Sequence, residues 1–344
     1  MSNEIEAFLF DHNGFKPQRI VPAVNSVTWR LNKTGLAQLF LPYSDPLCTP
    51  ERLAYGNRVL IRFASGLPDF GGVIDFPRVQ TETGVKFSIY AGDRVLDWRI
   101  SVKTASFTQV PPGDIARRMV MDASAIRSTG LIPASIAASK MYRTETYHLA
   151  NILDALQRLA RQSSEEYQVV PLYAGGQLQF GLEWAPFLGH NRADEILLVE
   201  GRNIETPVEM TEQGPVASIV KTAGGGAGGT TWNDRLVGIA TDADAEAEYG
   251  YREYSEVVTG VFDQATLDAT AAALLQRMKR SRKHFKLTAL AADPSPFDRY
   301  DVGDIVTLQA FLDRGDWEFN GPVRITGRMW NASTTCRLEA EEWL

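Results

Sequence analysis

The sequence predicts an α+β fold that is predominantly antiparallel β, with two related small β-barrel-like domains and an inserted α/β lobe. Three observations lead to this prediction. Strand-like segments separated by turn residues occupy both ends of the chain, helical periodicity is confined to the middle and to one later segment, and one strand–loop–strand pattern occurs twice. The chain of 344 residues is long enough for about two or three compact units.

Residues 1–103 are expected to form the first β-barrel-like domain, which residues 200–222 would complete. Strand signals rich in β-branched and aromatic residues, bounded by Gly, Pro and Asn, occur at residues 27–31, 37–41, 58–63 and 85–90. The last segment alternates with a period of two, as in a sheet with one buried face. Short antiparallel strands at this spacing suit a small barrel or sandwich.

Residues 104–199 are expected to form the inserted α/β lobe. Asp114 is the predicted N-cap of a short helix. A longer helix is predicted from about Thr146 to Gln162, because its large apolar residues fall on one stripe. A hairpin with its turn at 174–176 follows. Since each helix has a single apolar stripe, we expect the lobe to pack on its own small sheet and to be separable from the flanking domains.

Residues 223–344 are expected to form the second β-barrel-like domain. It contains a predicted helix from about Asp263 to His284, with a stripe of leucine, alanine and methionine. A strand signal at 218–222 precedes a glycine-rich segment. Further strand signals occur at residues 304–308, 323–326 and 335–340.

One pattern occurs near both ends of the chain. Residues 55–61 resemble residues 300–308, with a Gly followed by Asn or Asp just before a β-branched strand. Downstream, residues 70–74 resemble residues 319–325 at nearly the same offset. Two interpretations stay open: a duplicated β-domain, or a chance similarity between two ordinary hairpins.

The composition argues against several classes of protein. There are 35 Lys and Arg against 42 Asp and Glu, a net charge of -7, whereas a stand-alone nucleic-acid binder needs a basic surface. Cys48 and Cys336 have no local partner, so no disulfide framework or zinc knuckle is expected and a reducing compartment is favoured. Residues 1–6 lack the features of a secretory signal, and no apolar run reaches the roughly 18 residues of a membrane span.

The sequence contains no convincing motif for catalysis or cofactor binding. Gly224, Gly226 and Gly229 fit the spacing G-x-G-x-x-G, but the turn-like residues 230–234 follow where a dinucleotide site needs a helix. A flexible loop is therefore the favoured interpretation. No G-x-S-x-G elbow is present. The histidines are scattered and fit no zinc motif; they are His12, His148, His190 and His284.

Three charged clusters have a functional and a structural interpretation. A cation site at Asp298, Asp301 and Asp304 is less favoured than turn-forming aspartates, because the order of an EF-hand loop is absent. A nucleic-acid contact is less favoured than a solvated helix end or subunit contact for the basic run Arg277, Lys279, Arg280, Arg282, Lys283 and Lys286. A general acid/base pair is less favoured than a solvated acidic loop for Asp242, Asp244, Glu246 and Glu248. The sequence thus predicts no catalytic, cofactor-binding or metal-ligating residue.

Several segments, taken in order, resemble the baseplate or tail-tip hub proteins of tailed phages and related injection machines. The resemblance spans most of the chain, and its individual motifs are short, so their order carries it. The segments are residues 27–35, 39–42, 56–61, 71–74, 89–93 with Leu96 and Arg99, 300–306 and 323–328.

The resemblance implies a non-enzymatic structural hub in the virion, at the tail tip or baseplate, assembled in the host cytoplasm. It implies a homotrimer of two-barrel subunits whose pseudo-sixfold ring joins the sixfold tail tube to threefold tip, spike or fibre proteins. The implied partners are distal tail or tail tube proteins, a tape measure protein and DNA that passes without specific binding. The chain has no room for an appended spike, lysozyme or receptor-binding module, and neither a membrane span nor a cofactor is expected.

A second function from another class is a tail-associated glycan-binding or glycan-degrading protein. It would use exposed aromatic residues such as Trp184 and Trp232 together with Asp/Glu pairs. Clustering of these tryptophans with two carboxylates in one cleft would favour it. Their dispersal into separate cores would favour the hub.

Overall fold

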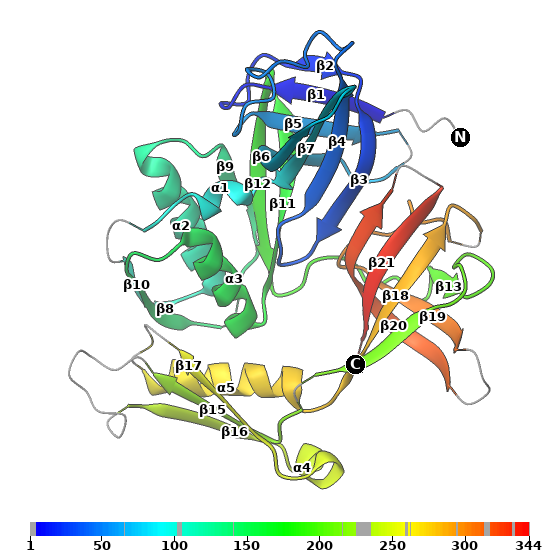
Figure 1. Ribbon diagram of the computed structural model, residues 1–344. Helices are drawn as coiled ribbons and strands as arrows, with labels where there is room; N and C mark the ends of the chain where they lie inside the picture. The colour runs from blue at the N-terminus through cyan, green and yellow to red at the C-terminus, as the bar shows by residue number, and fades with distance from the viewer. Residues whose placement is uncertain are drawn as a thin grey trace.

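The computed structural model (Figure 1) describes residues 5–64, 66–101, 105–139, 141–214, 216–224, 235–258, 261, 263–293, 295–312, 317–331 and 334–343. It confirms a mixed α+β fold whose strands are mostly antiparallel. Figure 1 shows the N-terminal strands in blue, an α/β lobe in cyan and green, a smaller α/β unit in yellow and the C-terminal strands in orange and red.

The elements follow one another along these parts. The N-terminal part contains β1 (Ile5–Phe10), β2 (Gln18–Ile20), β3 (Ala23–Arg30), β4 (Leu36–Pro42), β5 (Arg58–Phe63), β6 (Phe70–Gln80), β7 (Gly84–Ala91) and α1 (Arg94–Asp97). The lobe contains β8 (Ala105–Val110), α2 (Pro112–Ile126), β9 (Leu131–Ile136), β10 (Arg143–Tyr147), α3 (Ile152–Ser163), β11 (Glu166–Ala174) and β12 (Gln177–Ala185). The smaller unit contains β15 (Ile219–Gly224), β16 (Val237–Thr241), α4 (Ala243–Tyr249), β17 (Glu253–Val258) and α5 (Gln264–Met278). The other strands are β13 (Leu197–Val199), β14 (Glu209–Gln213), β18 (Arg282–Leu290), β19 (Ile305–Leu312), β20 (Trp317–Trp330) and β21 (Thr335–Glu342).

The N-terminal and C-terminal strands form one continuous sheet. Its order is β14-β18-β21-β20-β3-β4-β7-β6-β5-β1-β2, and β19 pairs with both β20 and β13. The two halves join where β3 runs antiparallel to β20, from Val27 opposite Trp330 to Arg30 opposite Gly327. A single hydrophobic core follows the sheet across this junction.

This continuous sheet differs from the two barrel-like domains that the sequence predicted. Among the described strands, neither half closes into a barrel; the main path of the sheet ends at β14 and at β2, and a branch through β19 ends at β13. The physical reason is that the outer edge of β3 pairs with β20 of the other half. The halves therefore extend one another instead of closing separately.

The sequence predicted that residues 200–222 complete the first β-domain, but in the structure they do not. Within this range β14 pairs with β18, from Glu209 opposite Lys286 to Gln213 opposite Arg282. The preceding strand β13 pairs with β19. Both strands thus extend the C-terminal half, because the free edges available to them belong to β18 and β19.

The repeated pattern of the sequence forms two hairpins of the same kind. In the first, Gly56 N donates to Ile74 O at 2.9 Å, and Ile74 N donates to Asn57 O at 2.8 Å. Gly56 has a φ of 84°, which a glycine adopts without the steric cost of a side chain. A register shift between β6 and β7 follows directly after these bonds.

The second hairpin, between β19 and β20, repeats this arrangement bond for bond. Gly303 N donates to Ile325 O at 2.7 Å, and Ile325 N donates to Asp304 O at 2.9 Å. Gly303 has a φ of 99°, and a register shift between β20 and β21 again follows the isoleucine. The shared hydrogen-bond pattern favours duplication over chance similarity.

The lobe shares its core with the N-terminal strands. Its hydrophobic cluster includes Phe10, Leu60 and Val73 together with residues of α2, α3, β11 and β12. Arg58 of β5 also reaches into the lobe and donates to Leu178 O at 2.6 Å. Removal of the lobe would therefore expose one face of the first sheet, which conflicts with the expectation of a separable unit.

Both helices of the lobe start at other residues than the sequence predicted. The N-cap of α2 is Pro111, and Asp114 lies in the first turn and pairs with Arg117 at 2.9 Å. The N-cap of α3 is Asn151, whose side chain accepts a hydrogen bond from Asp154 N at 3.1 Å. Thr146 instead belongs to β10, where it lies opposite Ser106 of β8.

The smaller α/β unit joins two segments that the sequence assigned to different domains. Parallel and antiparallel pairing places β15 between β16 and β17. Helix α5 packs on one face of this sheet, around a core of Val220, Ala271, Leu274 and Leu275. In Figure 1 the unit lies below the lobe, with α5 between its sheet and α3.

Candidate functional site

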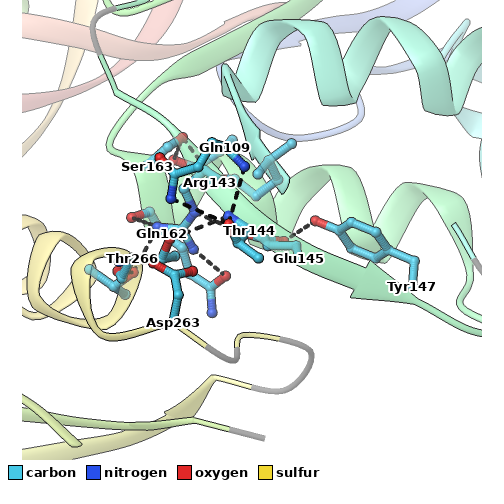
Figure 2. Close-up of polar contacts among 12 residues, drawn as sticks. Gln109, Arg143, Thr144, Glu145, Tyr147, Gln162, Ser163, Asp263 and Thr266 are labelled. Carbon is cyan, nitrogen blue, oxygen red and sulfur yellow. Dashed lines mark hydrogen bonds and ion pairs between the residues drawn. The ribbon is translucent and has the colours of Figure 1, made fainter. Parts of the chain in front are cut away.

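A buried polar cluster lies where the lobe meets α5 (Figure 2). Arg143 and Glu145 of β10 are 0% and 2% exposed, and the Arg143 Nε lies 2.8 Å from the Glu145 Oε1. The Arg143 Nη1 donates to Thr270 Oγ1 of α5 at 2.7 Å. The same guanidinium donates to the Gln162 carbonyl of α3 at 3.3 Å. One arginine thus connects three elements of two parts of the molecule.

Neighbouring groups complete this cluster. The backbone N of Thr144 donates to Thr266 Oγ1 at 3.3 Å. The Tyr147 hydroxyl donates to the second Glu145 oxygen. Burial, followed by the negative charge of Glu145, raises the pKa of Tyr147 well above its ordinary value, so the hydroxyl keeps its proton and remains a donor. Since these groups are buried and satisfied by one another, the cluster is suited to holding the two parts together rather than to binding a substrate.

The sequence contains a signal for this cluster that the motif survey missed. Arg143, Glu145 and Tyr147 are spaced two residues apart, which places them on one face of a strand. Two charges of opposite sign on a buried face must pair with each other. Their partners on α3 and α5 are distant in sequence and carry no local signal.

An open cavity of about 500 Å³ lies beside the cluster, between α3, α5 and β17. It is lined by Arg158 and Arg161 of α3 and by Arg277 of α5. Arg161 pairs with Glu256 at 3.2 Å, and Arg277 donates to the Arg161 carbonyl at 3.0 Å. Arg161 and Arg277 thus stabilise the rim of the same contact between the lobe and the smaller unit.

A buried carboxyl group lies at another junction, between the N-terminal half and the lobe. Asp93 is 1% exposed and accepts a hydrogen bond from Thr34 Oγ1 at 2.9 Å. Burial raises the pKa of Asp93 to about 7. A cavity of about 100 Å³ adjoins it and is lined by residues that include Trp29 and Gln168. Asp93 therefore changes its charge near neutral pH at this junction.

The glycine motif does not form a dinucleotide site in the part of the chain that the structure describes. Gly224 is the last residue of β15, and the next described helix is α4, which begins only at Ala243. Gly226 and Gly229 lie outside the described residues.

The four histidines lie in different segments of the described structure. His190 Nδ1 lies 3.5 Å from Asp304 Oδ1, and His284 lies on β18. His12 and His148 are exposed. The described residues contain no group of three or more His, Cys, Asp and Glu that could hold a metal ion.

Two of the three spaced aspartates accept hydrogen bonds from the backbone. Asp304 Oδ2 accepts from Asp301 N at 2.9 Å, and Asp304 Oδ1 accepts from His190 N at 2.8 Å. Asp301 Oδ1 accepts from Val302 N at 2.6 Å. These bonds fix the turn before β19, which agrees with the turn-forming interpretation.

The sequence predicted that the basic run forms the end of one helix, but the structure divides it between a helix and a strand. Helix α5 ends at Met278, and β18 begins at Arg282. On this strand Lys286 pairs with Glu209 at 3.0 Å, and Lys283 lies 3.9 Å from Glu342. The backbone becomes extended because β18 pairs with β21 and β14, which overrides the local preference for helix.

The acidic stretch is a helix and not the predicted loop. Asp242 is its N-cap and accepts a hydrogen bond from Ala245 N at 3.0 Å. Lys279 lies 3.3 Å from Asp242, and the pKa of Asp242 is lowered, chiefly by the hydrogen bond from Ala245. Asp244 and Glu246 lie in the first turn, where negative charge favours the helix.

The aromatic residues proposed for glycan binding do not form an exposed platform in the described structure. Trp184 is 1% exposed and its indole nitrogen donates to Glu165. Trp232 lies outside the described residues. A buried indole cannot stack on a sugar, so no described observation favours the glycan function. No described helix is long and apolar enough to cross a membrane.

Solved structures with the same fold are found over nearly the full length of the chain. The prophage tail protein gp18 from Listeria monocytogenes EGD-e has a TM-score of 0.59 at 11% identity, with 98% of this chain and 94% of that chain covered. The tail protein from Neisseria meningitidis MC58 has a TM-score of 0.59 at 13% identity, covering 98% and 96%. The 43 kDa tail protein of prophage MuSo2 from Shewanella oneidensis has a TM-score of 0.58 at 14% identity, covering 98% and 98%.

A protein of a secretion machine shares the fold as well. It is the E. coli c3393 protein, a type VI secretion component described as similar to the T4 tail proteins gp27 and gp5, with a TM-score of 0.55 at 11% identity and coverage of 94% and 75%. No family model and no curated protein matches the sequence. The fold is thus one that tail proteins of phages and prophages share.

Proposed function

We propose that this chain is a structural hub of a phage tail tip or baseplate. The observation that carries the proposal is the agreement of fold with three tail proteins, each across 98% of the chain. An agreement in the arrangement of elements along the whole chain arises by chance less readily than one shared motif. The segments that resembled hub proteins in the sequence lie in the two hairpins and the strands beside them.

The hub would be a homotrimer whose ring has pseudo-sixfold symmetry. Two hairpins with one hydrogen-bond pattern support this, because two equivalent units in each of three subunits give about six similar positions around one axis. Such a ring can contact sixfold tail tube or distal tail proteins on one side and threefold tip, spike or fibre proteins on the other.

The hub would have no enzymatic role and would be located in the virion, after assembly in the host cytoplasm. It would contact the tape measure protein and let DNA pass through the ring without specific binding. The net charge of -7 supports this passage, since negative charge disfavours contact with phosphate. The polar groups of the Arg143 cluster are engaged with one another, which supports a structural role.

Native mass spectrometry of the purified protein, followed by electron microscopy with its genomic neighbours co-expressed, tests this function. A trimer with a central channel that caps a sixfold tube is the expected result. A monomer or dimer that forms no ring with any neighbour would overturn the proposal, and so would hydrolysis of cell-wall polysaccharide that a single Asp or Glu substitution abolishes.

A further inference from the structure

The two halves of the large sheet have the same strand order. In the N-terminal half it is β3-β4-β7-β6-β5, and in the C-terminal half it is β14-β18-β21-β20-β19. The two equivalent hairpins fix the correspondence, because Ile74 of β6 and Ile325 of β20 make the same backbone bonds. Thus β3 corresponds to β14, and β6 corresponds to β20.

The halves differ in how two of these strands are used. The last part of β20, residues 327–330, pairs with the outer edge of β3. Its counterpart on β6 is Asp75 followed by residues 78–80, which pair with β7 on one side. On the other side β5 pairs only as far as Val73, and no described strand continues along that edge. The outer edge of β14 is likewise the end of the sheet.

The residue pairs of β6 with β7 correspond one by one to those of β20 with β21. Arg78 lies opposite Phe87 as Arg328 lies opposite Leu338, so the two arginines correspond. Both arginines contact the turn before their hairpin. Arg78 donates to Leu53 O at 2.8 Å and lies 5.0 Å from the ring of Tyr55.

Arg328 repeats these contacts with a single residue. It donates to the carbonyl oxygen of Tyr300 and lies 5.5 Å from the ring of Tyr300. The exposure of the two strands differs, however. Arg328 is buried at 1% exposure, whereas Arg78 is only half-buried and its neighbours Phe76 and Val79 on β6 are 64% and 50% exposed. Residues 78–80 of β6 thus correspond to the part of β20 that pairs with β3, but no described strand pairs with their outer edge.

The strand pairing points to an intermolecular repeat of the β3–β20 contact: β14 of one copy adds to the free edge of β6 on the next copy. If β14 and β6 pair in the register of β3 and β20, Thr211 lies opposite Val79 and Glu212 lies opposite Arg78. The second pair joins opposite charges, and cross-strand pairs of opposite charge stabilise a sheet. Unpaired edges of this kind are suited to β-augmentation.

This contact is head to tail, so it closes a ring only if the rotation per step divides a full turn. The contact within the chain and the contact between chains would then alternate around the ring. The inference rests on the proposed trimeric hub, and it names the two edges through which its subunits join.

Disulfide trapping tests the register. A variant with Thr211→Cys and Val79→Cys is made in a background with Cys48→Ser, while the native Cys336 is buried and stays unchanged. Cβ atoms of directly opposed residues lie close enough for a disulfide, whereas those two positions away do not. After mild oxidation, bands at two and three times the monomer mass of 38.1 kDa are expected on a denaturing gel without reductant.

The matched control combines Val79→Cys with Glu209→Cys, two residues along the same strand, and is expected to yield at least tenfold less cross-linked product. Native mass is measured on the reduced variants in parallel. Trimers that cross-link equally well in both variants, or not at all, would overturn the strand pairing while leaving the hub intact. A disulfide that forms within one chain, so that the oxidised protein migrates as a monomer, would also overturn the pairing. Monomers at every concentration would overturn both the pairing and the trimeric hub.

Discussion

The replacement Asp93→Asn should stabilise the protein at neutral and alkaline pH. Asp93 is buried, and the Thr34 hydroxyl donates a hydrogen bond to its carboxyl group. Its pKa is raised from 3.8 to about 7 by burial. Asparagine keeps the shape and an oxygen that can accept from Thr34, but it never carries the buried charge.

The magnitude follows from proton linkage. A raised pKa in the folded state means that the folded protein holds its proton longer than the unfolded chain does. The contribution of this proton is complete below about pH 4, declines as the pH rises and is lost above about pH 7. With about 1.4 kcal/mol for each tenfold change in proton affinity, the ionised carboxyl costs the folded state up to about 4 kcal/mol.

Urea unfolding at pH 4, 5, 6, 7 and 8, followed by tryptophan fluorescence, measures this effect. The difference between the Asn variant and the native protein should grow from near zero at pH 4 to a few kcal/mol at pH 8. The exposed Glu82 provides a control, since Glu82→Gln should follow the native protein at every pH. A constant difference across this range, or a variant that is less stable at pH 8, would refute the reasoning.

Three further changes have defined outcomes. Arg143→Met leaves Glu145 buried without its cation and should lower the free energy of unfolding in urea by about 3–5 kcal/mol. Arg161→Met, at the exposed rim, should lower it by less than about 1 kcal/mol. Equal losses in the two variants would contradict this. Replacing residues 105–185 by a short linker should expose the face of the first sheet and increase binding of a hydrophobic dye, whereas a remainder with native spectra would show that the lobe is separable. Asp242→Ala removes the cap of α4 and should speed amide exchange there by about fivefold, as expected for about 1 kcal/mol; unchanged exchange would exclude the cap as a stabiliser.

Local sequence patterns predicted much of the secondary structure. The alternation of residues 85–90 corresponds to β7, and the hairpin with its turn at 174–176 corresponds to β11 and β12. The repeat of residues 55–61 at 300–308 corresponds to two hairpins with the same backbone bonds. These features are readable because side-chain periodicity and turn residues act over a few positions of the chain.

Helix boundaries were predicted less well, and the reason is again local. Charged residues after Met278 continue a helix-compatible composition, and the sequence alone gives no stop signal there. Pairing with β21 and β14 makes the next residues extended from Arg282 onward. The acidic stretch is predicted as a loop, although Asp242 is a good N-cap residue for the helix that follows.

The sequence by itself thus determined the β-rich class, the order of most strands, one duplicated hairpin and the absence of any recognisable catalytic motif. Only the tertiary structure decided that β3 pairs with β20, that β14 joins β18 and that Arg143 connects β10 to α3 and α5. Each of these contacts joins segments far apart in the chain. Edge pairing and buried charge depend on which surfaces meet after folding, and a pattern with a period of two or 3.6 residues does not encode the partner.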